Sequence, residues 1–73
     1  MVDTNKLNVL IEQSGLKKRY IAQKLGISEV SLWSKITNRT PFTGIEVDVL
    51  CKLLDVKTIR QQREIFFTEE HTN

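Results

Sequence analysis

Residues 15–38 have the sequence G-L-K-K-R-Y-I-A-Q-K-L-G-I-S-E-V-S-L-W-S-K-I-T-N, which predicts two short helices joined by a tight turn. The first helix covers about residues 17–24, where apolar side chains recur on one helical face. Gly26 ends this helix, because the residue just past a helix commonly has a left-handed backbone, which glycine adopts without steric cost. Ser28 caps the second helix, over about residues 29–37, by accepting a hydrogen bond from a free amide of the first turn. Leu32 and Ile36, at positions i and i+4, direct this second helix back against the first.

The spacing I-A-x-x-L-G-I-S-x-x-S-L, from Ile21 to Leu32, places a small residue, a turn glycine and a capping serine at the offsets that such a helix pair needs. This motif resembles the helix-turn-helix of the phage repressor and Cro family, which belongs to the xenobiotic-response-element-like regulators. Outside the motif, the matching residues are Leu16, Lys35, Ile36, Pro41, Phe42, Thr43, Glu46, Leu50, Leu54 and Val56. The resemblance covers about residues 4–67. It implies an all-α fold, a compact bundle of about five short helices like the lambda-repressor DNA-binding domain.

The remaining helices are predicted from their caps and apolar spacing. A first helix over about residues 5–13, capped by Asp3 or Thr4, has a buried face of Leu7, Leu10 and Ile11. Thr43-x-x-Glu46 is a capping box that starts another helix at Gly44. The apolar face of that helix is expected to contain Ile45, Val49, Leu50, Leu53 and Leu54. Thr58-x-x-Gln61 is a second capping box, which opens a last helix that runs to about Ile65.

The length of 73 residues predicts one small domain over residues 1–67, followed by a polar, frayed tail over residues 68–73. No segment approaches the ~20 consecutive apolar residues of a membrane span, and the N-terminus has no basic stretch followed by an apolar one. We therefore expect a soluble cytoplasmic protein with no membrane partner, and the resemblance implies a bacterial host cell and a place on the nucleoid. Cys51, the single cysteine, lies in an apolar helical stripe and is interpreted as a buried apolar residue.

Basic side chains are concentrated in one segment. Between residues 17 and 39 the chain has six basic residues and one acid, Glu29, whereas the rest has five basic and eight acidic residues, for a total net charge of +2. A one-sided positive field attracts and orients a polyanion such as DNA. The alternative interpretation is an ordinary solvated helix face.

The resemblance implies that the second helix of the pair enters the major groove of DNA. By position, the base-contacting residues are Ser28, Glu29, Val30, Trp33 and Ser34. Glu29 suits the amino group of cytosine, Val30 suits the methyl group of thymine, and Ser34 is weakly selective. Trp33 either faces out toward DNA or packs onto the domain's own surface. Since the first turn lacks an arginine that could bind guanine through two hydrogen bonds, we expect modest base readout.

Phosphate contacts are expected from the basic residues around this helix and from the loop that follows it. The predicted set is Lys17, Lys18, Arg19, Lys35, Asn38 and Arg39. Lys18 stands where many relatives have glutamine, so we expect it to contact phosphate and not to read bases. Asn38 stands where relatives commonly have glycine, and asparagine tolerates the left-handed backbone that this position needs. The exposed amides of this loop, together with Arg39, are predicted to clamp a phosphate.

The C-terminal segment has more apolar residues than a core of this size is expected to cover, a feature typical of a subunit contact. Ile59, Phe66 and Phe67 are therefore predicted to form a homodimer interface, at least on DNA. The alternative is that Ile59, Ile65 and one phenylalanine complete the core.

These features predict a sequence-specific regulator of transcription that binds double-stranded DNA. As the resemblance implies, it is of the phage or prophage type, a Cro-like protein or minimal repressor, and binds a pseudo-palindromic operator as a dimer. The alternative is a protein-binding antirepressor or modulator that uses the same fold to bind a partner repressor, since Glu29 and Trp33 also suit a protein interface. One histidine, one cysteine and no carboxylates at ligand spacing predict no enzyme activity, no metal and no cofactor.

Overall fold

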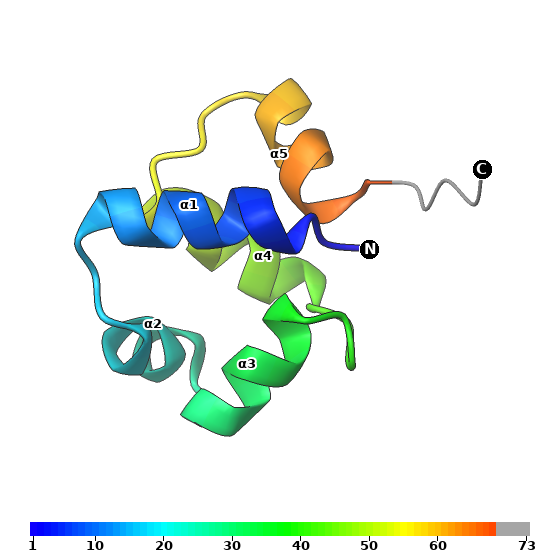
Figure 1. The fold of residues 1–73 in the computed structure, drawn as a ribbon. Helices are drawn as coiled ribbons and strands as arrows, with labels where there is room; N and C mark the ends of the chain where they lie inside the picture. Colours follow the sequence, from blue (N-terminus) through cyan, green and yellow to red (C-terminus); the bar gives the residue numbers. More distant parts are fainter. Residues whose placement is uncertain (69–73) are drawn as a thin grey trace.

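Five α-helices form the ordered framework of residues 1–68, the part of the chain that the computed structural model describes (Figure 1). They are α1 (Thr4–Ser14), α2 (Lys18–Leu25), α3 (Glu29–Ile36), α4 (Gly44–Leu53) and α5 (Ile59–Phe66). No strand occurs among these residues, so the predicted all-α class with about five short helices is confirmed. In Figure 1, α2 and α3 lie at the bottom and α5 lies at the top, with α1 and α4 between them.

The helix ends follow from the capping residues in the sequence. Asp3 caps α1 by accepting a hydrogen bond from the Lys6 amide at 3.1 Å, and Gly15 ends this helix with a left-handed φ of 73°. The predicted capping box of α4 is complete: Thr43 Oγ1 accepts from the Glu46 amide, and the Glu46 carboxylate accepts from the Thr43 amide. These local hydrogen bonds satisfy amides that the helices themselves leave free.

The cap of α5 is less complete than the sequence predicts. Thr58 Oγ1 accepts from the Gln61 amide at 3.1 Å, as in a capping box. The Gln61 side chain, however, accepts from the Lys57 amide at 3.4 Å and not from the amide of the capping residue itself. The start of α5 was therefore predicted correctly, but the second hydrogen bond of the cap comes from Lys57, the residue before the capping Thr58.

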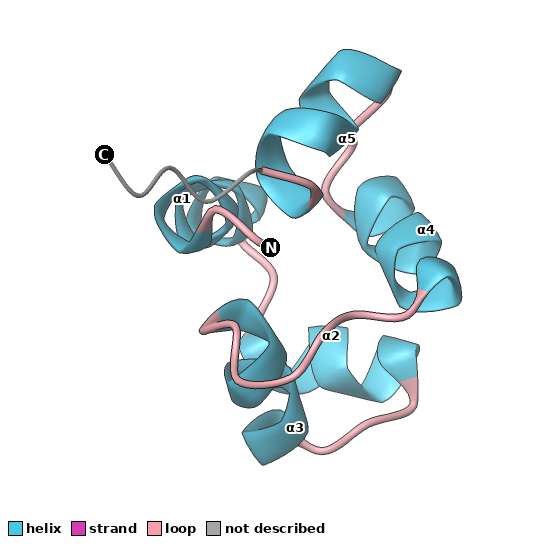
Figure 2. Cartoon of the chain, turned by 90° about the vertical axis from the view of Figure 1, so that its right-hand side faces the viewer, coloured by secondary structure: helices cyan, strands magenta, loops and turns pink. Residues whose placement is uncertain are grey.

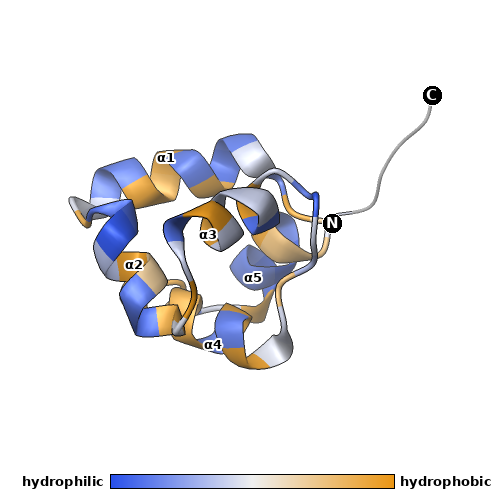
Figure 3. Cartoon of the chain, turned by 90° about the horizontal axis from the view of Figure 1, so that it is seen from below, coloured by the Kyte–Doolittle hydropathy of each residue, from blue (hydrophilic) through white to orange (hydrophobic). Residues whose placement is uncertain are grey.

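One apolar core joins all five helices. Its four most deeply buried large side chains come from four different helices, and α5 adds Ile65 and Phe66. The four are Leu7, Ile21, Leu32 and Leu50. In Figure 2 the helices surround a central region, and the core side chains pack together there. Figure 3 shows apolar and polar stretches alternating along the helices. This alternation is the pattern of helices that each bury one face.

The buried face of α4 differs from the predicted one. Ile45 is 79% exposed, whereas Val47, Leu50, Cys51 and Leu54 are buried. These four residues follow the i, i+3, i+4, i+7 spacing of a single helical face, and Ile45 lies about 140° around the helix from Leu50. The prediction of Ile45 as a core residue is therefore wrong. The burial of the free Cys51 is confirmed. The pKa of its thiol is raised, mainly by burial and to a smaller extent by the negative charge of Asp48.

The first residues of the chain are part of the fold. Val2 is buried, and the Asp3 amide donates to the carbonyl of Ile65 at 2.7 Å. The Thr68 amide donates to the carbonyl of Met1 at 3.0 Å, so Thr68 belongs to the folded part and not to the predicted tail. Residues 69–73, the remainder of that predicted tail, lie outside the described residues. Within residues 1–68, no helix has both the length and the apolar character that crossing a membrane requires.

Candidate nucleic-acid interface

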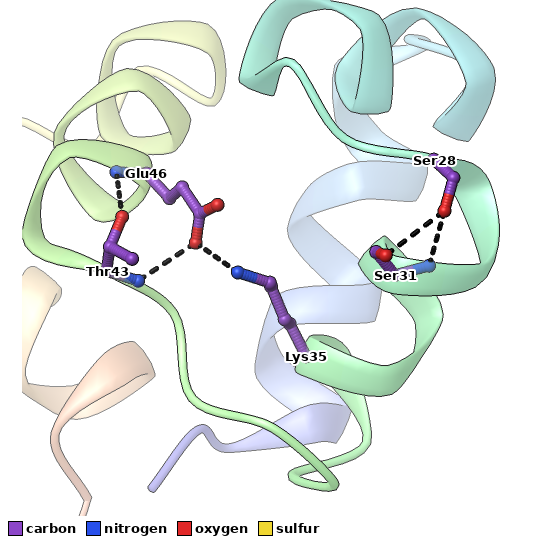
Figure 4. Close-up of polar contacts among 5 residues, drawn as sticks. All are labelled: Ser28, Ser31, Lys35, Thr43 and Glu46. Carbon is purple, nitrogen blue, oxygen red and sulfur yellow. Dashed lines mark hydrogen bonds and ion pairs between the residues drawn. The ribbon is translucent and has the colours of Figure 1, made fainter.

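The turn between α2 and α3 has the geometry that the sequence predicts. Gly26 has a left-handed φ of 72°, and its amide donates back to carbonyls of the last turn of α2. The Ile27 amide donates to the carbonyl of Ala22 at 3.0 Å. The Ser28 hydroxyl accepts from the Ser31 amide at 3.0 Å and donates to the Ser31 hydroxyl at 3.1 Å (Figure 4). Ser28 therefore fixes the start of α3, and only one lone pair of its hydroxyl remains for the predicted base contact.

The outward side of α3 carries both apolar and polar groups. Val30 is 74% exposed and Trp33 is 50% exposed, while Glu29 is exposed in the first turn of the helix. Ser34 is partly exposed beside them. Ser28, Glu29, Val30 and Trp33 are therefore accessible at and beyond the start of α3, and Ser34 is partly so.

Trp33 combines features of both predicted alternatives. Its ring lies at the surface, but the Arg39 guanidinium lies over it, 4.8 Å from the ring centroid. A positively charged guanidinium over an indole ring is attracted by the electron-rich face of the ring. This contact holds Arg39, which follows α3 in sequence, beside the outward surface of that helix.

Lys35 does not belong to this surface, so its prediction as a phosphate contact is corrected. Its Nζ lies 2.6 Å from Glu46 Oε1, and the two side chains are only 14% and 12% exposed (Figure 4). The same oxygen accepts from the Thr43 amide at 2.9 Å. Burial by itself raises the pKa of the Glu46 carboxyl, but the hydrogen bonds from Lys35 and Thr43 and the charge of Lys35 outweigh it. The pKa therefore lies below its ordinary value, and the positive charge of Lys35 is balanced inside the molecule.

Asn38 and the loop amides are also occupied within the fold. Asn38 has the expected left-handed backbone, with a φ of 65°. Its side chain, however, accepts from the Val2 amide and donates to the Val2 carbonyl, both at 2.8 Å. The Arg39 and Thr40 amides both donate to the carbonyl of Ser34, at 2.8 and 3.3 Å. The predicted phosphate clamp from Asn38 and the loop amides is therefore wrong, and only the Arg39 side chain remains available.

The other predicted phosphate contacts lie on exposed parts of the chain. Of the eleven Lys and Arg side chains, four form ion pairs with carboxylates of residues 1–68 and seven do not. Five of these seven fall between residues 17 and 39, and the other two are Arg60 and Arg63 on α5. The five are Lys17, Lys18, Arg19, Lys24 and Arg39. Lys24 lies 5.5 Å from the ring centroid of Tyr20, which is 41% exposed.

The predicted dimer residues separate into two groups. Ile59 and Phe67 are 71% and 56% exposed. Phe66, in contrast, is 4% exposed and packs edge to face against Phe42, with ring centroids 5.9 Å apart. Phe66 is therefore a core residue, and its assignment to a dimer interface is corrected. Ile59 lies on about the same side of α5 as Phe66, seven residues later, but it is the first residue of the helix and lies beyond the core.

No local sequence signal pairs Glu46 with Lys35, or places Thr4 and Val2 at the end of α3. Thr4 Oγ1 donates to the carbonyl of Ile36 at 2.6 Å. The capping-box pattern identified Glu46 as a cap residue, and no local signal could assign its second partner, which lies eleven positions away on another helix. Among residues 1–68, no group of His, Cys, Asp or Glu side chains is arranged to hold a metal ion.

Comparison of this chain with protein-family models, curated proteins and solved structures found no match. Residues 1–68 form an all-α domain of five short helices, in which the exposed side of α3 carries Val30 and Trp33, with Arg39 over the Trp33 ring.

Proposed function

We propose that this protein is a sequence-specific regulator of transcription that binds double-stranded DNA. In this proposal α2 and α3 form a helix-turn-helix, and α3 enters the major groove, which is wide enough for one α-helix. The protein acts as a Cro-like protein or minimal repressor of phage or prophage type, on the nucleoid in the cytoplasm of a bacterial host. Its role is binding and not catalysis, and it needs no cofactor.

The observation that carries this proposal is the distribution of unpaired basic side chains. Cations elsewhere on the molecule mostly face a carboxylate, such as Lys52 beside Asp48 at 3.3 Å. The cations on α2 and the loop after α3 have no such partner among residues 1–68. Helix α2 packs against α3, and Arg39 lies over the exposed Trp33 of α3. Phosphates on either side of a groove would supply the missing negative charge, with release of bound counterions.

In this arrangement the contacts divide by chemistry. Lys17, Lys18, Arg19 and Arg39 bind phosphates and supply most of the affinity. Val30 and Trp33 offer apolar contact to thymine methyl groups, and Glu29 accepts a hydrogen bond from cytosine. Ser34 can donate to or accept from a base and is weakly selective. Sequence preference should be modest for each base, since no basic side chain of α3 itself is free to bind guanine.

The proposed DNA-bound form is a homodimer on a pseudo-palindromic operator. Ile59 and Phe67 are the exposed apolar side chains that would meet across the two-fold axis. Each copy then places its α3 in a major groove, with half-sites about one helical turn, or 34 Å, apart.

The test is selection of binding sites from a random pool of DNA duplexes about 30 base pairs long. Affinity for the enriched sequence is then measured between about 50 and 200 mM salt, where several phosphate contacts should cost orders of magnitude. An enriched pseudo-palindrome with a steep salt dependence would support the proposal. Retention without enrichment would leave only a cationic surface, and no retention at low salt would contradict it.

A second candidate function is binding to a partner repressor, as an antirepressor or modulator. It is favoured by the exposure of Val30 and Trp33 beside the carboxylate of Glu29, because aromatic residues are frequent at the centre of protein interfaces. Glu29→Gln separates the two functions. DNA affinity should rise when this negative charge is removed near phosphates, whereas a protein complex that relies on the charge should weaken.

A further inference from the structure

The C-terminal end of α3 is held by polar contacts from three other parts of the chain. Lys35 meets Glu46 of α4, and the Ile36 carbonyl accepts from Thr4 of α1. Just after the helix, Asn38 forms two hydrogen bonds with the backbone of Val2. Among residues 1–68, the Lys35–Glu46 pair is the only polar side-chain contact between α3 and α4. The end of α3 thus has fixed neighbours that its apolar side chains alone would not specify.

Glu46 is held in place by contacts within its own helix cap, in addition to its contact with Lys35. Its amide donates to Thr43 Oγ1 at 3.2 Å, and its Oε1 accepts from the Thr43 amide at 2.9 Å (Figure 4). The capping box of α4 therefore fixes a carboxylate that points toward α3. The carboxyl pKa lies below its ordinary value, because the bonds from Lys35 and Thr43 outweigh the effect of burial, so the group is ionised at neutral pH. A fixed and poorly hydrated charge of this kind restricts where the Lys35 ammonium can lie.

We propose that Glu46 is a positioning residue that, through Lys35, fixes α3 against α4 and is thereby required for reading DNA sequence without touching DNA. This inference rests on the proposed function of α3. It also makes Lys35 a structural cation and not a phosphate contact, despite its place in the most basic segment of the chain.

A variant of Glu46 should therefore bind its operator more weakly while its affinity for random DNA stays the same. Base contacts need side chains within hydrogen-bond distance of particular base edges, so a small displacement of α3 breaks them. Long, flexible side chains such as Lys18 can follow a phosphate through the same displacement. Affinity for a selected operator should therefore respond to Glu46, while affinity for random DNA should not.

Glu46→Gln provides the main test, because glutamine also serves in a capping box and only the charge is removed. Dissociation constants are measured for the selected operator and for a random duplex of equal length, across the same salt series. We expect about tenfold weaker operator binding, with random binding changed less than about twofold and the salt dependence unchanged. Glu64→Gln is the matched control, because its pair with Lys6 is 3.9 Å long and half-exposed.

The double variant Lys35→Met/Glu46→Gln tests whether the effect passes through Lys35. Because Glu46 acts through Lys35 in this proposal, removing both charges should cost about as much specificity as Glu46→Gln alone, so the losses of the two single variants should not add. If Glu46→Gln weakens operator and random DNA equally, the positioning role is overturned. A salt dependence steeper by about one phosphate contact would overturn it too, since Lys35 would then have moved onto DNA.

Hydrogen exchange in the free protein tests the anchoring without DNA. The Arg39 and Thr40 amides, which donate to the Ser34 carbonyl, should exchange at least about fivefold faster in Glu46→Gln, while the Ile21 amide of α2 should not change. Unchanged exchange at these loop amides would overturn the inference whatever the DNA result. If the wild-type protein selects no operator, the proposed function and the inference both fail. If it selects one and Glu46→Gln keeps the full preference, only the inference fails.

Discussion

The inward and outward sides of α3 differ in how many of their side chains have partners within the protein. On the inward side, Leu32 and Ile36 are buried in the core, and Lys35 is paired with Glu46. On the outward side, Val30 and Trp33 remain largely accessible. Basic side chains differ in a similar way: Lys52 and Lys57 are paired with carboxylates, whereas those of α2 have no carboxylate partner among residues 1–68. On the outward side, the exposed Trp33 has the basic Arg39 beside it, with the guanidinium 4.8 Å from the ring centroid.

The largest expected effect comes from the inward side of α3. Leu32→Ala removes a side chain that is 1% exposed and should lower the free energy of unfolding by about 3 kcal/mol, since such truncations leave a cavity. Val30→Ala, on the outward side of the same helix, should change it by less than about 0.5 kcal/mol. Urea unfolding followed by circular dichroism measures both. Equal losses for the two variants would mean that the two sides of α3 do not differ as described.

Charge reversal tests the division between unpaired and paired cations. Lys18→Glu combined with Arg19→Glu should weaken operator binding about a hundredfold at low salt, because two phosphate contacts become repulsive. Acidic residues at a helix start are favourable, so stability should not fall. The matched control, Lys52→Glu with Lys57→Glu, changes the net charge by the same amount at paired sites. Equal weakening in a filter-binding or fluorescence assay would indicate that net charge alone determines binding.

Arg39 provides a finer test, because it is the one side chain of the predicted loop clamp that remains free. Arg39→Ala should weaken binding about fivefold to every sequence and lower the salt dependence by about one contact. Arg60→Ala removes an arginine of α5 that also has no carboxylate partner among residues 1–68, and it should leave both quantities unchanged. A change of base preference in Arg39→Ala, without a change in salt dependence, would contradict phosphate binding by this residue.

The smallest expected effect concerns acid stability. Because the folded-state pKa of Glu46 lies below its ordinary value of 4.5, its ionised form stabilises the fold above that value. This contribution is lost as the pH falls through the folded-state pKa, when the carboxylate takes up a proton. Glu46→Gln should therefore lose less stability than the wild type between pH 7 and about pH 3, measured as the urea midpoint. A parallel loss in both proteins would show that Glu46 does not contribute to acid sensitivity.

Local sequence signals predicted the helices well. The ends of α1, α3 and α4 follow from Asp3, Ser28 and Thr43, whose hydroxyl or carboxylate groups bond to amides only a few residues away. The left-handed backbones at Gly26 and Asn38 were likewise predicted from residue type. Such interactions involve neighbours in the chain, so the sequence contains both partners in readable order.

Part of the candidate site was also predictable, and the errors have a common cause. The exposure of Glu29, Val30 and Trp33 follows from the helical spacing of Leu32 and Ile36. Spacing alone cannot say whether an accessible-looking cation or amide has a partner elsewhere. The predicted phosphate contacts of Lys35 and Asn38 fail for this reason, since their partners Glu46 and Val2 lie far from them in sequence.

The sequence by itself therefore determined the helix ends, the turn at Gly26 and the concentration of basic residues between residues 17 and 39. Only the tertiary structure decided that Lys35 is balanced by Glu46, that Asn38 holds Val2, and which apolar residues of α4 and α5 are buried. The physical reason is the distance along the chain between the residues that interact. Caps and turns depend on hydrogen bonds within a few residues, whereas burial and ion pairing depend on which helices meet in space.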